Sequence, residues 1–389
     1  MRRARRRGSI RGPEVAKSIR LARLWAAGRV VLIGAGIAGV VLIMLFFGFP
    51  LIQDLITGTD PSLRYVPSLQ ADFTALGAAA DTGEIEPQEM FLTDFPIKNE
   101  PYIAGDQIIF TTRHGNKDVY ELDTVVLFDI SSGEARILSG VDKKYDNLLQ
   151  PMLSGNTAVW LDSMSAGGGR VVGYDLSTGT QFTIKDYGYA MPRLSLSGEL
   201  LAFMQWAGDS TQRLYVYNVR TREPVTVKLY QNNPYGNSAA SVSGKDLVWS
   251  EYGSDDSAQL KRIVFADGVA RYENYDLHMN VFEPKTNGRD IIFTTTRNAA
   301  DGSLMLSTNG GEPVLIAQNV SNYGIGDNFV AYTKGERVYI CFTDEQNVFS
   351  LTSDISKTLL SCANGRAITY YDVTDGVLAD EVVMYAIVR

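Results

Sequence analysis

The sequence predicts an all-β fold, a seven-bladed β-propeller of four-stranded blades, preceded by one transmembrane helix. A glycine followed closely by two apolar residues and an aromatic recurs in seven copies, with some variation in the last two. Consecutive copies begin 38 to 50 residues apart, which is the period of a four-stranded blade. Upstream of the copies, residues 30–49 carry no charged side chain, and this run indicates the helix.

Residues 1–29 are predicted to be a basic cytoplasmic tail. They hold ten Lys or Arg and one acid, Glu14, so the rest of the chain keeps 26 of the 36 basic and 43 of the 44 acidic residues. The formal charge of that remainder is therefore about −17. Because binding to phosphate backbones needs a cationic surface, we expect no nucleic acid among the partners of the acidic body.

Residues 30–52 are predicted to form a signal-anchor helix. Val30 to Phe49 is apolar throughout, and twenty helical residues span about 30 Å of hydrocarbon. The upstream cations keep the N-terminus in the cytoplasm, which sends everything after Pro50 to the outer side of a bacterial cell membrane. A cleaved signal peptide is the alternative, but the apolar run is long for one and no clear small-residue cleavage site follows it.

The apolar run also contains a match to the GxGxxG dinucleotide-binding pattern, at Gly34, Gly36 and Gly39. A true fingerprint opens an amphipathic helix in a soluble βαβ unit, whereas this one lies inside a segment that is apolar on every face. Small residues four apart, such as Ala35 and Gly39, instead favour close helix packing in the membrane. A helix-mediated dimer is one arrangement consistent with this spacing.

Each copy of the glycine motif continues in a similar way. A polar loop leads to a second apolar strand and a tight turn, as in Val171 to Leu176 followed by Ser177-Thr178-Gly179, and then to a short strand. With the less regular strand before each glycine, this gives four strands per unit and a propeller over residues 87–389. The aromatic is expected on the second strand, between neighbouring blades. The copies begin at Gly105, Gly155, Gly198, Gly244, Gly288, Gly326 and Gly365.

The last unit contains one strand too few. After Glu381 to Val388 only three strands have been placed, whereas Met90 to Thr93, ahead of the first unit, is similar to Val348 to Thr352. We therefore expect the N-terminal segment to supply the outer strand of the seventh blade, which closes the ring and leaves only short edges. Residues 53–86 show no repeat similarity and are expected to form a stalk or linker.

The repeated unit resembles those of a known family group. A Ser-Gly turn, an apolar pair with Trp or Phe, and then a Tyr-Asp-x-Ser/Thr-x-Gly turn, as in Tyr174 to Gly179, look like the TolB-like and tryptophan-aspartate-like propeller repeats of bacterial envelope proteins. The resemblance covers about residues 87–389 and implies the fold rather than a function. The Ser-Pro-Asp-Gly turn common in TolB-like repeats is replaced by forms such as Ser243-Gly244, and a membrane anchor stands where TolB has an extra domain. A role in the Tol system is therefore not implied.

The sequence offers no identifiable catalytic set. It contains no G-x-S-x-G nucleophile elbow, and neither His114 nor His278 has a recognisable nucleophile partner. No spacing matches a metal-binding loop, so we expect neither a metal nor another cofactor. Whether Cys341, expected on a third strand, and Cys362, beside an innermost one, pair is left open. A glycan-active hydrolase or lyase would need paired carboxylates at the channel mouth.

The segments that join consecutive units are rich in Tyr with Asp or Asn. In an up-and-down blade these joints share one face with the loops after the motif strands, so that face presents aromatic rings and amides suited to docking a protein or glycan. Each ring has an alternative role, which is to seal the joint between two blades. The candidate binding residues are Tyr145, Tyr187, Tyr189, Tyr235, Tyr275, Tyr323 and His114.

These expectations combine into one hypothesis. The protein is predicted to be a single-pass membrane protein that displays a propeller outside the cell membrane and binds an envelope protein or cell-wall glycan without catalysis. The alternative is an anchored glycan-active enzyme that uses carboxylates at the channel mouth.

Overall fold

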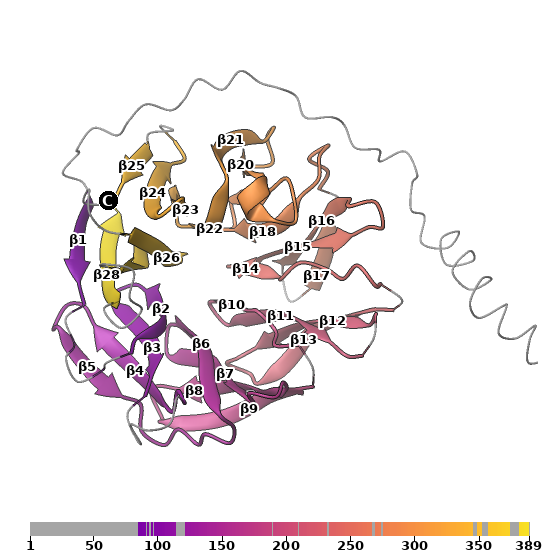
Figure 1. The fold of residues 1–389 in the computed structure, drawn as a ribbon. Helices are drawn as coiled ribbons and strands as arrows, with labels where there is room; N and C mark the ends of the chain where they lie inside the picture. The colour runs from indigo at the N-terminus through magenta and orange to yellow at the C-terminus, as the bar shows by residue number, and fades with distance from the viewer. Residues whose placement is uncertain are drawn as a thin grey trace, which may run out of the picture. The chain divides into compact units, whose positions relative to one another are not determined.

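The computed structural model describes residues 85–388, apart from 91, 93–94, 96, 114–120, 189, 209, 232, 267–268, 274, 345–347, 352–356 and 374–380. These residues form seven four-stranded antiparallel sheets arranged as blades around a central axis (Figure 1), which confirms the seven-bladed part of the predicted fold. Within them no helix is long and apolar enough to cross a membrane. The predicted tail, the anchor at 30–52 and residues 53–84 of the predicted stalk lie outside the described residues.

Blades 1 to 3 follow one another along the chain, and each begins with its innermost strand. Blade 1 contains β2 (Asn99–Ala104), β3 (Gln107–Thr112), β4 (Thr124–Asp129) and β5 (Glu134–Ile137). Blade 2 contains β6 (Asn147–Ser154), β7 (Thr157–Ser163), β8 (Gly169–Asp175) and β9 (Thr180–Tyr187). Blade 3 contains β10 (Leu194–Ser197), β11 (Leu200–Trp206), β12 (Gln212–Asn218) and β13 (Glu223–Tyr230).

Blades 4 to 6 repeat this order. Blade 4 contains β14 (Ser241–Ser243), β15 (Asp246–Tyr252), β16 (Ala258–Ala266) and β17 (Val269–Glu273). Blade 5 contains β18 (Phe282–Thr286), β19 (Asp290–Thr294), β20 (Ser303–Thr308) and β21 (Val314–Gln318), with a short 3₁₀ turn, η2 (Ala299–Asp301), before β20. Blade 6 contains β22 (Val320–Ile325), β23 (Phe329–Lys334), β24 (Arg337–Phe342) and β25 (Val348–Ser350).

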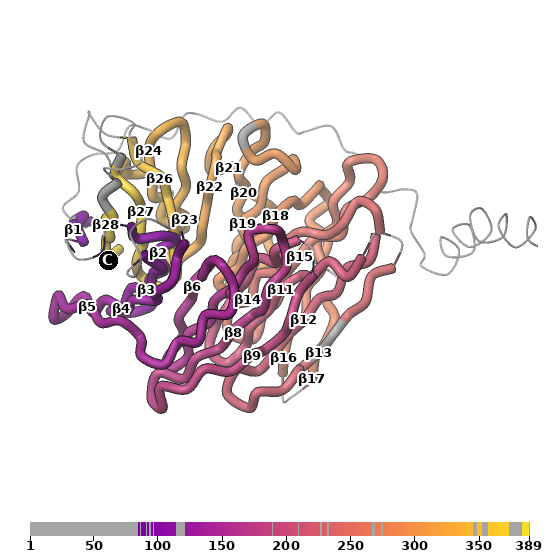
Figure 2. The backbone as a smooth tube through the Cα atoms, turned by 60° about the horizontal axis from the view of Figure 1, so that its bottom comes forward, coloured from indigo at the N-terminus to yellow at the C-terminus, as the bar shows by residue number. Residues whose placement is uncertain are grey.

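The seventh blade combines strands from both ends of the described chain. β26 (Lys357–Asn364), β27 (Ala367–Val373) and β28 (Glu381–Val388) are completed by β1 (Ile85–Glu89), which pairs with β28 and lies beside it in Figures 1 and 2. The predicted closure by an N-terminal strand is confirmed. The strand itself precedes the expected Met90 to Thr93, because the Met90 side chain turns into the core between blades 7 and 1 and is 1% exposed.

The glycine motif lies on the second strand of every blade, and its pattern follows from the alternation of side chains along a strand. In blade 2, Ala158 and Trp160 belong to the apolar cluster shared with blade 1, whereas Val159 between them belongs to the cluster shared with blade 3. The first and third motif positions thus pack on the preceding blade, except in blade 6, where the aromatic comes one place later and Val330 and Tyr332 pack on blade 5. The motif aromatics, at the third position or, for Tyr332, one place later, are all buried, as predicted: Phe110, Trp160, Phe203, Trp249, Phe293, Tyr332 and Tyr370.

The glycine before each second strand lies in the tight turn that connects the first strand to the second. Gly105 has a φ of +57°, a left-handed conformation that glycine adopts without steric cost, and five of the other six motif glycines also have positive φ. The exception is Gly326, whose N–H donates to the carbonyl of Phe329 at 2.9 Å. In the last copy the middle position is Thr369, whose hydroxyl donates to the carbonyl of Pro101 in blade 1 at 2.6 Å. That threonine therefore helps to close the ring.

Each joint between innermost strands is bridged by a side chain. An innermost strand has one edge with no strand beside it, and polar backbone groups on such an edge need other partners. Side chains of the adjacent blade supply them. From joint 1–2 to joint 7–1 the bonds are Gln150 N to Glu100 Oε2, Leu194 N to Gln150 Oε1, Val242 N to Ser195 Oγ, Thr286 N to Ser241 Oγ, Lys285 Nζ to Tyr323 O, Asn322 Nδ2 to Leu360 O, and Ser361 Oγ to Pro101 O.

The turns between third and outermost strands in blades 1 and 2 contain hydrogen-bonded carboxylates. Asp129 Oδ1 accepts from Ser131 Oγ at 2.6 Å, and Asp175 Oδ1 accepts from Ser177 Oγ at 2.6 Å. These hydrogen bonds hold the pKa of both carboxyls below the ordinary 3.8. In blade 3 the amide oxygen of Asn218 makes the same turn by accepting from two backbone N–H groups.

We expect the two carboxylates to make the protein sensitive to acid. Because their pKa is lower in the folded than in the unfolded state, their contribution to stability is complete above about pH 4 and is lost as the pH falls through the lowered pKa. Replacing both Asp129 and Asp175 with Asn, the residue at position 218, should flatten the dependence of stability on pH below 4. Urea unfolding followed by circular dichroism at pH 2 to 7 measures this pH dependence. If stability fell as steeply with acid in the double variant as in the wild type, the two carboxylates would not be the cause of the acid sensitivity.

Candidate functional site

The two faces of the ring differ in how they are built. We call the joint face the one formed by the connections between blades and by the loops between second and third strands; the other turns form the turn face. Ile85, the first residue of β1, pairs with Val388 at the end of β28, and both lie at the turn face. The joint face is therefore free of both ends of the described chain.

The structure distributes the predicted binding tyrosines between the surface and the interior. Tyr235 is 44% exposed on the joint between blades 3 and 4, and Tyr145 and Tyr275 are half-buried. Tyr187 and Tyr323 are buried among the apolar residues of two blades, the position expected of a ring that seals a joint. His114 and Tyr189 lie outside the described residues. The binding role of these residues stays a prediction.

Tyr145 is positioned by a buried ion pair. Asp162, at the joint end of β7, is fully buried and accepts from the backbone N–H of Lys144 at 2.8 Å and of Tyr145 at 2.9 Å. The same carboxylate accepts from Nε of Arg170 at 2.8 Å. Nη2 of that arginine donates to the carbonyl of Asp142. One carboxylate thus fixes the whole joint between blades 1 and 2.

A chain of polar contacts runs from Tyr235 to the rim of the central channel. Arg297 Nη2 donates to the carbonyl of Tyr235 at 3.1 Å, and the same guanidinium lies 4.5 Å from the ring centre of Tyr252. The Tyr252 hydroxyl donates to Glu283 Oε1 at 2.7 Å, and Arg193 Nη1 lies 3.5 Å from Glu283 Oε2. Burial and the Glu283 carboxylate raise the pKa of Tyr252, so its hydroxyl remains a donor. Three blades meet in this contact chain.

Sequence reasoning did not single out the rim residues Glu100, Gln150 and Glu283. Their φ angles are 47°, 49° and 46°, an uncommon conformation for residues other than glycine, and each lies at an irregularity of an innermost strand. A sequence signal was present. Each of these three rim residues precedes a proline and lies five residues before a motif glycine. Backbone strain of this kind gathers at functional sites, and it here places two carboxylates at equivalent positions of blades 1 and 5.

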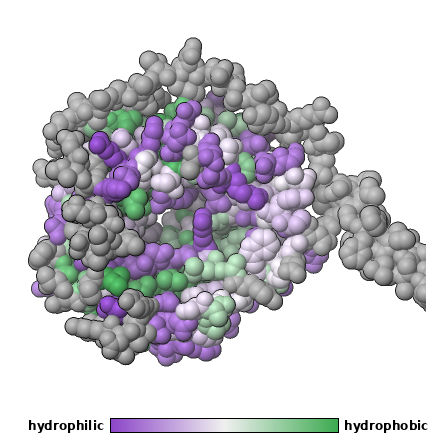
Figure 3. All heavy atoms as spheres, viewed as in Figure 1, coloured by the Kyte–Doolittle hydropathy of each residue, from purple (hydrophilic) through white to green (hydrophobic). Residues whose placement is uncertain are grey.

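Exposed apolar side chains are distributed unevenly over the described residues. Of the twelve large hydrophobic side chains that are exposed there, six lie on outermost strands, five lie on the joint face and Leu359 lies on the innermost strand β26, and none lies in a turn-face turn. Those of the joint face are Ile97, Met164, Met191, Tyr235 and Met279. Figure 3 shows one face of the ring, on which hydrophilic residues gather around a hollow centre.

The turn face carries a polar cavity of about 590 Å³ at the end of the channel. Turns of blades 1, 2 and 3 and an innermost strand of blade 7 line it, through residues such as Asp106, Ser154, Ser197 and Asn364. Of these, Asn364 Nδ2 donates to the carbonyl of Ile103 at 2.9 Å and Ser197 Oγ accepts from the backbone of Gly244 at 2.9 Å. Part of its polar lining therefore serves to hold blades together.

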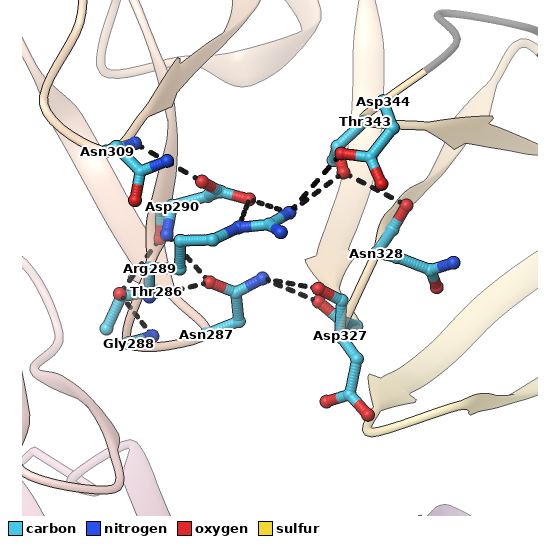
Figure 4. Close-up of polar contacts among 11 residues, drawn as sticks. Thr286, Asn287, Gly288, Arg289, Asp290, Asn309, Asp327, Asn328, Thr343 and Asp344 are labelled. Carbon is cyan, nitrogen blue, oxygen red and sulfur yellow. Dashed lines mark hydrogen bonds and ion pairs between the residues drawn. The ribbon is translucent and has the colours of Figure 1, made fainter.

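Blades 5 and 6 are joined on the turn face by the network in Figure 4. Arg289 Nη2 lies 2.7 Å from Oδ2 of the fully buried Asp290 and donates to Thr343 Oγ1 of blade 6 at 3.2 Å. Asn287 Nδ2 donates to the carbonyls of Gly326 and Asp327 at 2.9 and 3.1 Å. The hydrogen bonds that Arg289 donates to the Asp290 carboxylate raise the pKa of Arg289. This network fixes the turns of the two blades against each other.

The described part of the chain contains two cysteines and one histidine. Cys341 on β24 and Cys362 on β26 are free thiols, and burial raises their pKa to about 11 and about 12. Nδ1 of the exposed His278 lies 3.3 Å from Oδ2 of Asp276. Among the described residues no group of three or more His, Cys, Asp or Glu side chains is placed to hold a metal ion.

Comparison with known proteins identifies the fold. No protein-family model matches this sequence, and no curated protein matches it. The β-propeller domain of the Trilobed protease from Pyrococcus furiosus is 12% identical, with 76% of this chain and 94% of that chain covered and a TM-score of 0.57. An oligogalacturonate lyase in complex with manganese is 11% identical, with 80% and 95% covered and a TM-score of 0.52.

TolB from Acinetobacter baumannii is a further match, at 18% identity over 65% of each chain and a TM-score of 0.43. At 11% and 12% identity the likeness to the protease propeller domain and to the lyase shows the propeller fold alone.

Proposed function

We propose that this protein is a non-catalytic binding scaffold of the bacterial cell envelope. In this proposal the helix at residues 30–52 anchors the chain in the membrane, and the propeller lies outside, where its joint face docks an envelope protein or a cell-wall glycan. The observation that carries the proposal is the set of exposed apolar side chains on the joint face, which has no counterpart in the described turns of the turn face.

The chemistry of this set suits docking. Three of its five members are Met164, Met191 and Met279, and methionine adapts its shape to a partner because its side chain is flexible and polarisable. Tyr235 and Arg297 lie on the same face, and Met, Tyr and Arg are the residue types enriched in protein interfaces. No end of the described chain obstructs this face.

Crosslinking in intact cells tests the proposal. A variant with Met191 and Met279 changed to Ser is compared with one in which Leu229 and Val269, similarly exposed on outermost strands, are changed to Ser. We expect a defined partner, identified by mass spectrometry, whose crosslinked yield falls about tenfold in the first variant, as for two hot-spot side chains. The second variant should keep the wild-type yield. Equal losses in both variants would sink the assignment to the joint face.

A glycan-active enzyme is the second candidate, and Glu100 and Glu283 favour it. They occupy equivalent positions on the channel rim, and glycan hydrolysis commonly uses two carboxylates that flank the scissile bond. If this candidate is correct, the purified protein cleaves a cell-wall or acidic polysaccharide, and Glu100→Gln and Glu283→Gln each abolish cleavage. Cleavage that survives both substitutions would remove the rim carboxylates from consideration.

A further inference from the structure

We propose that the central channel contains a carboxylate-binding site, formed by Lys285 on the channel wall and Arg193 at the joint-face mouth, that takes a small organic acid or a sugar acid. The site does not depend on docking at the joint face, because it uses charged residues of the channel and none of the exposed apolar side chains.

Lys285 has unused hydrogen-bonding capacity. It lies on β18, the innermost strand of blade 5, where its ammonium donates to the carbonyl of Tyr323 at 2.5 Å and lies 4.9 Å from the centre of that ring. An ammonium has three N–H donors, and this is its one hydrogen bond within the described part of the chain. No described carboxylate lies within ion-pair distance of it. A cation removed from water without a counter-ion is unfavourable, and burial accordingly lowers the pKa of Lys285.

Arg193 brings a second cation to the same place. It precedes β10 of blade 3, yet its guanidinium reaches Glu283 of blade 5, and its positive charge is among the causes that lower the pKa of Lys285. The contact with Glu283 is long, at 3.5 Å, and the arginine side chain is 74% exposed. The guanidinium therefore remains accessible to a ligand that enters from the joint face.

Glu283 neutralises only one of the two cations. Its Oε1 accepts from the hydroxyl of Tyr252 at 2.7 Å, which holds the carboxylate in place beside Arg193. Lys285, Arg193 and Glu283 together keep one formal positive charge, inside a body whose formal charge is about −17. A local positive charge in an acidic protein attracts small anions selectively to that point.

The geometry of the donors favours a carboxylate. A guanidinium offers parallel N–H donors that match the two oxygens of a carboxylate, and an ammonium adds a point charge. The amides of Gln150 and Asn322, which are committed to neighbouring strands, make the surrounding wall polar. Organic acids and sugar acids share the carboxylate and differ in the rest of the molecule, so one set of titrations separates them.

Calorimetric titration of the purified full-length chain tests the site. The probes are succinate and glucuronate, each with its neutral counterpart, succinamide or glucose, and inorganic phosphate, all at constant ionic strength. We expect an acid to bind while its neutral counterpart does not, and the tighter acid identifies the source of the carboxylate. Absence of binding by both acids, equal binding of a neutral counterpart, or tighter binding of phosphate would overturn the proposal.

Three variants connect the binding to the named residues. Lys285→Met should weaken binding about tenfold or more, the worth of a hydrogen bond to a charged group, and Arg193→Gln should weaken it several-fold. Lys228→Met is the matched control, because Lys228 is also partly buried but is paired with Glu251 at 3.1 Å in the seam between blades 3 and 4. Arg193 is exposed, so its variant tests the site even if Lys285→Met fails to fold. Wild-type affinity in Arg193→Gln would refute the proposal.

Discussion

Replacing Trp160 with alanine is expected to lower the free energy of unfolding by about 3–5 kcal/mol, the usual effect of removing a large buried aromatic from a core. Trp160 is fully buried, and its ring centre lies 5.7 Å from that of Tyr174. It fills the seam between blades 1 and 2 together with Ile109 and Leu127 of blade 1. The rigid strands on either side cannot close the space that the indole leaves, so the cavity remains.

The natural repeats provide the control for this experiment. Blades 1, 3 and 5 have Phe110, Phe203 and Phe293 at the position of Trp160. Trp160→Phe should therefore lower the free energy of unfolding clearly less than Trp160→Ala. Phenylalanine leaves a smaller cavity than alanine, and it occupies the equivalent position in three other blades. Urea unfolding followed by far-ultraviolet circular dichroism measures both. If the two variants lost the same stability, the cavity explanation would be wrong.

Asp162→Asn is expected to destabilise the protein by about 3–5 kcal/mol, the cost of breaking a buried ion pair by removing one partner. The side chain of Asp162 is 0% exposed and that of Arg170 is 10% exposed, so the arginine keeps its charge in a place where water cannot replace the carboxylate. The amide would also present a donor to groups that are themselves donors. We expect faster hydrogen exchange at the backbone N–H groups of Lys144 and Tyr145, which the carboxylate now holds.

Asp142 supplies a matched control on the same arginine. Its carboxylate lies 3.7 Å from Arg170 Nη2 but is 81% exposed, and solvent screens exposed pairs so strongly that they contribute about 0–1 kcal/mol. Asp142→Asn should therefore leave the unfolding midpoint almost unchanged. Similar midpoints for the two variants would show that burial of Asp162 is not the cause.

The regular parts of this fold could be predicted because the sequence pattern that sets the packing of each blade lies within a single repeat. The alternation that places Ala158 and Trp160 on one side of a strand and Val159 on the other is visible in the sequence, and it recurs in every blade. The closing strand was predicted five residues too late, because its register depends on pairing with β28 rather than on a local pattern. Met90 was expected in the closing strand, but its side chain packs in the core between blades 7 and 1.

The candidate site was less predictable, because it depends on which groups different blades bring together. The sequence places Tyr187, Tyr235 and Tyr323 in joints, but only the neighbouring blade decides that Tyr235 is exposed and the other two are buried. The contact between Arg193 and Glu283 joins residues 90 positions apart in the chain. No local pattern encodes such a pair.

The pairing of β1 with β28 has a consequence for how the protein is made. Residues 85–89 leave the ribosome early, but their partner strand, residues 381–388, is synthesised nearly three hundred residues later. Blades 1 to 6 consist of strands that follow one another along the chain, so they can form in order during synthesis. The seventh cannot. Until its third strand emerges, β1 has no partner, and the growing ring remains an open arc whose first outer strand must be kept from pairing elsewhere.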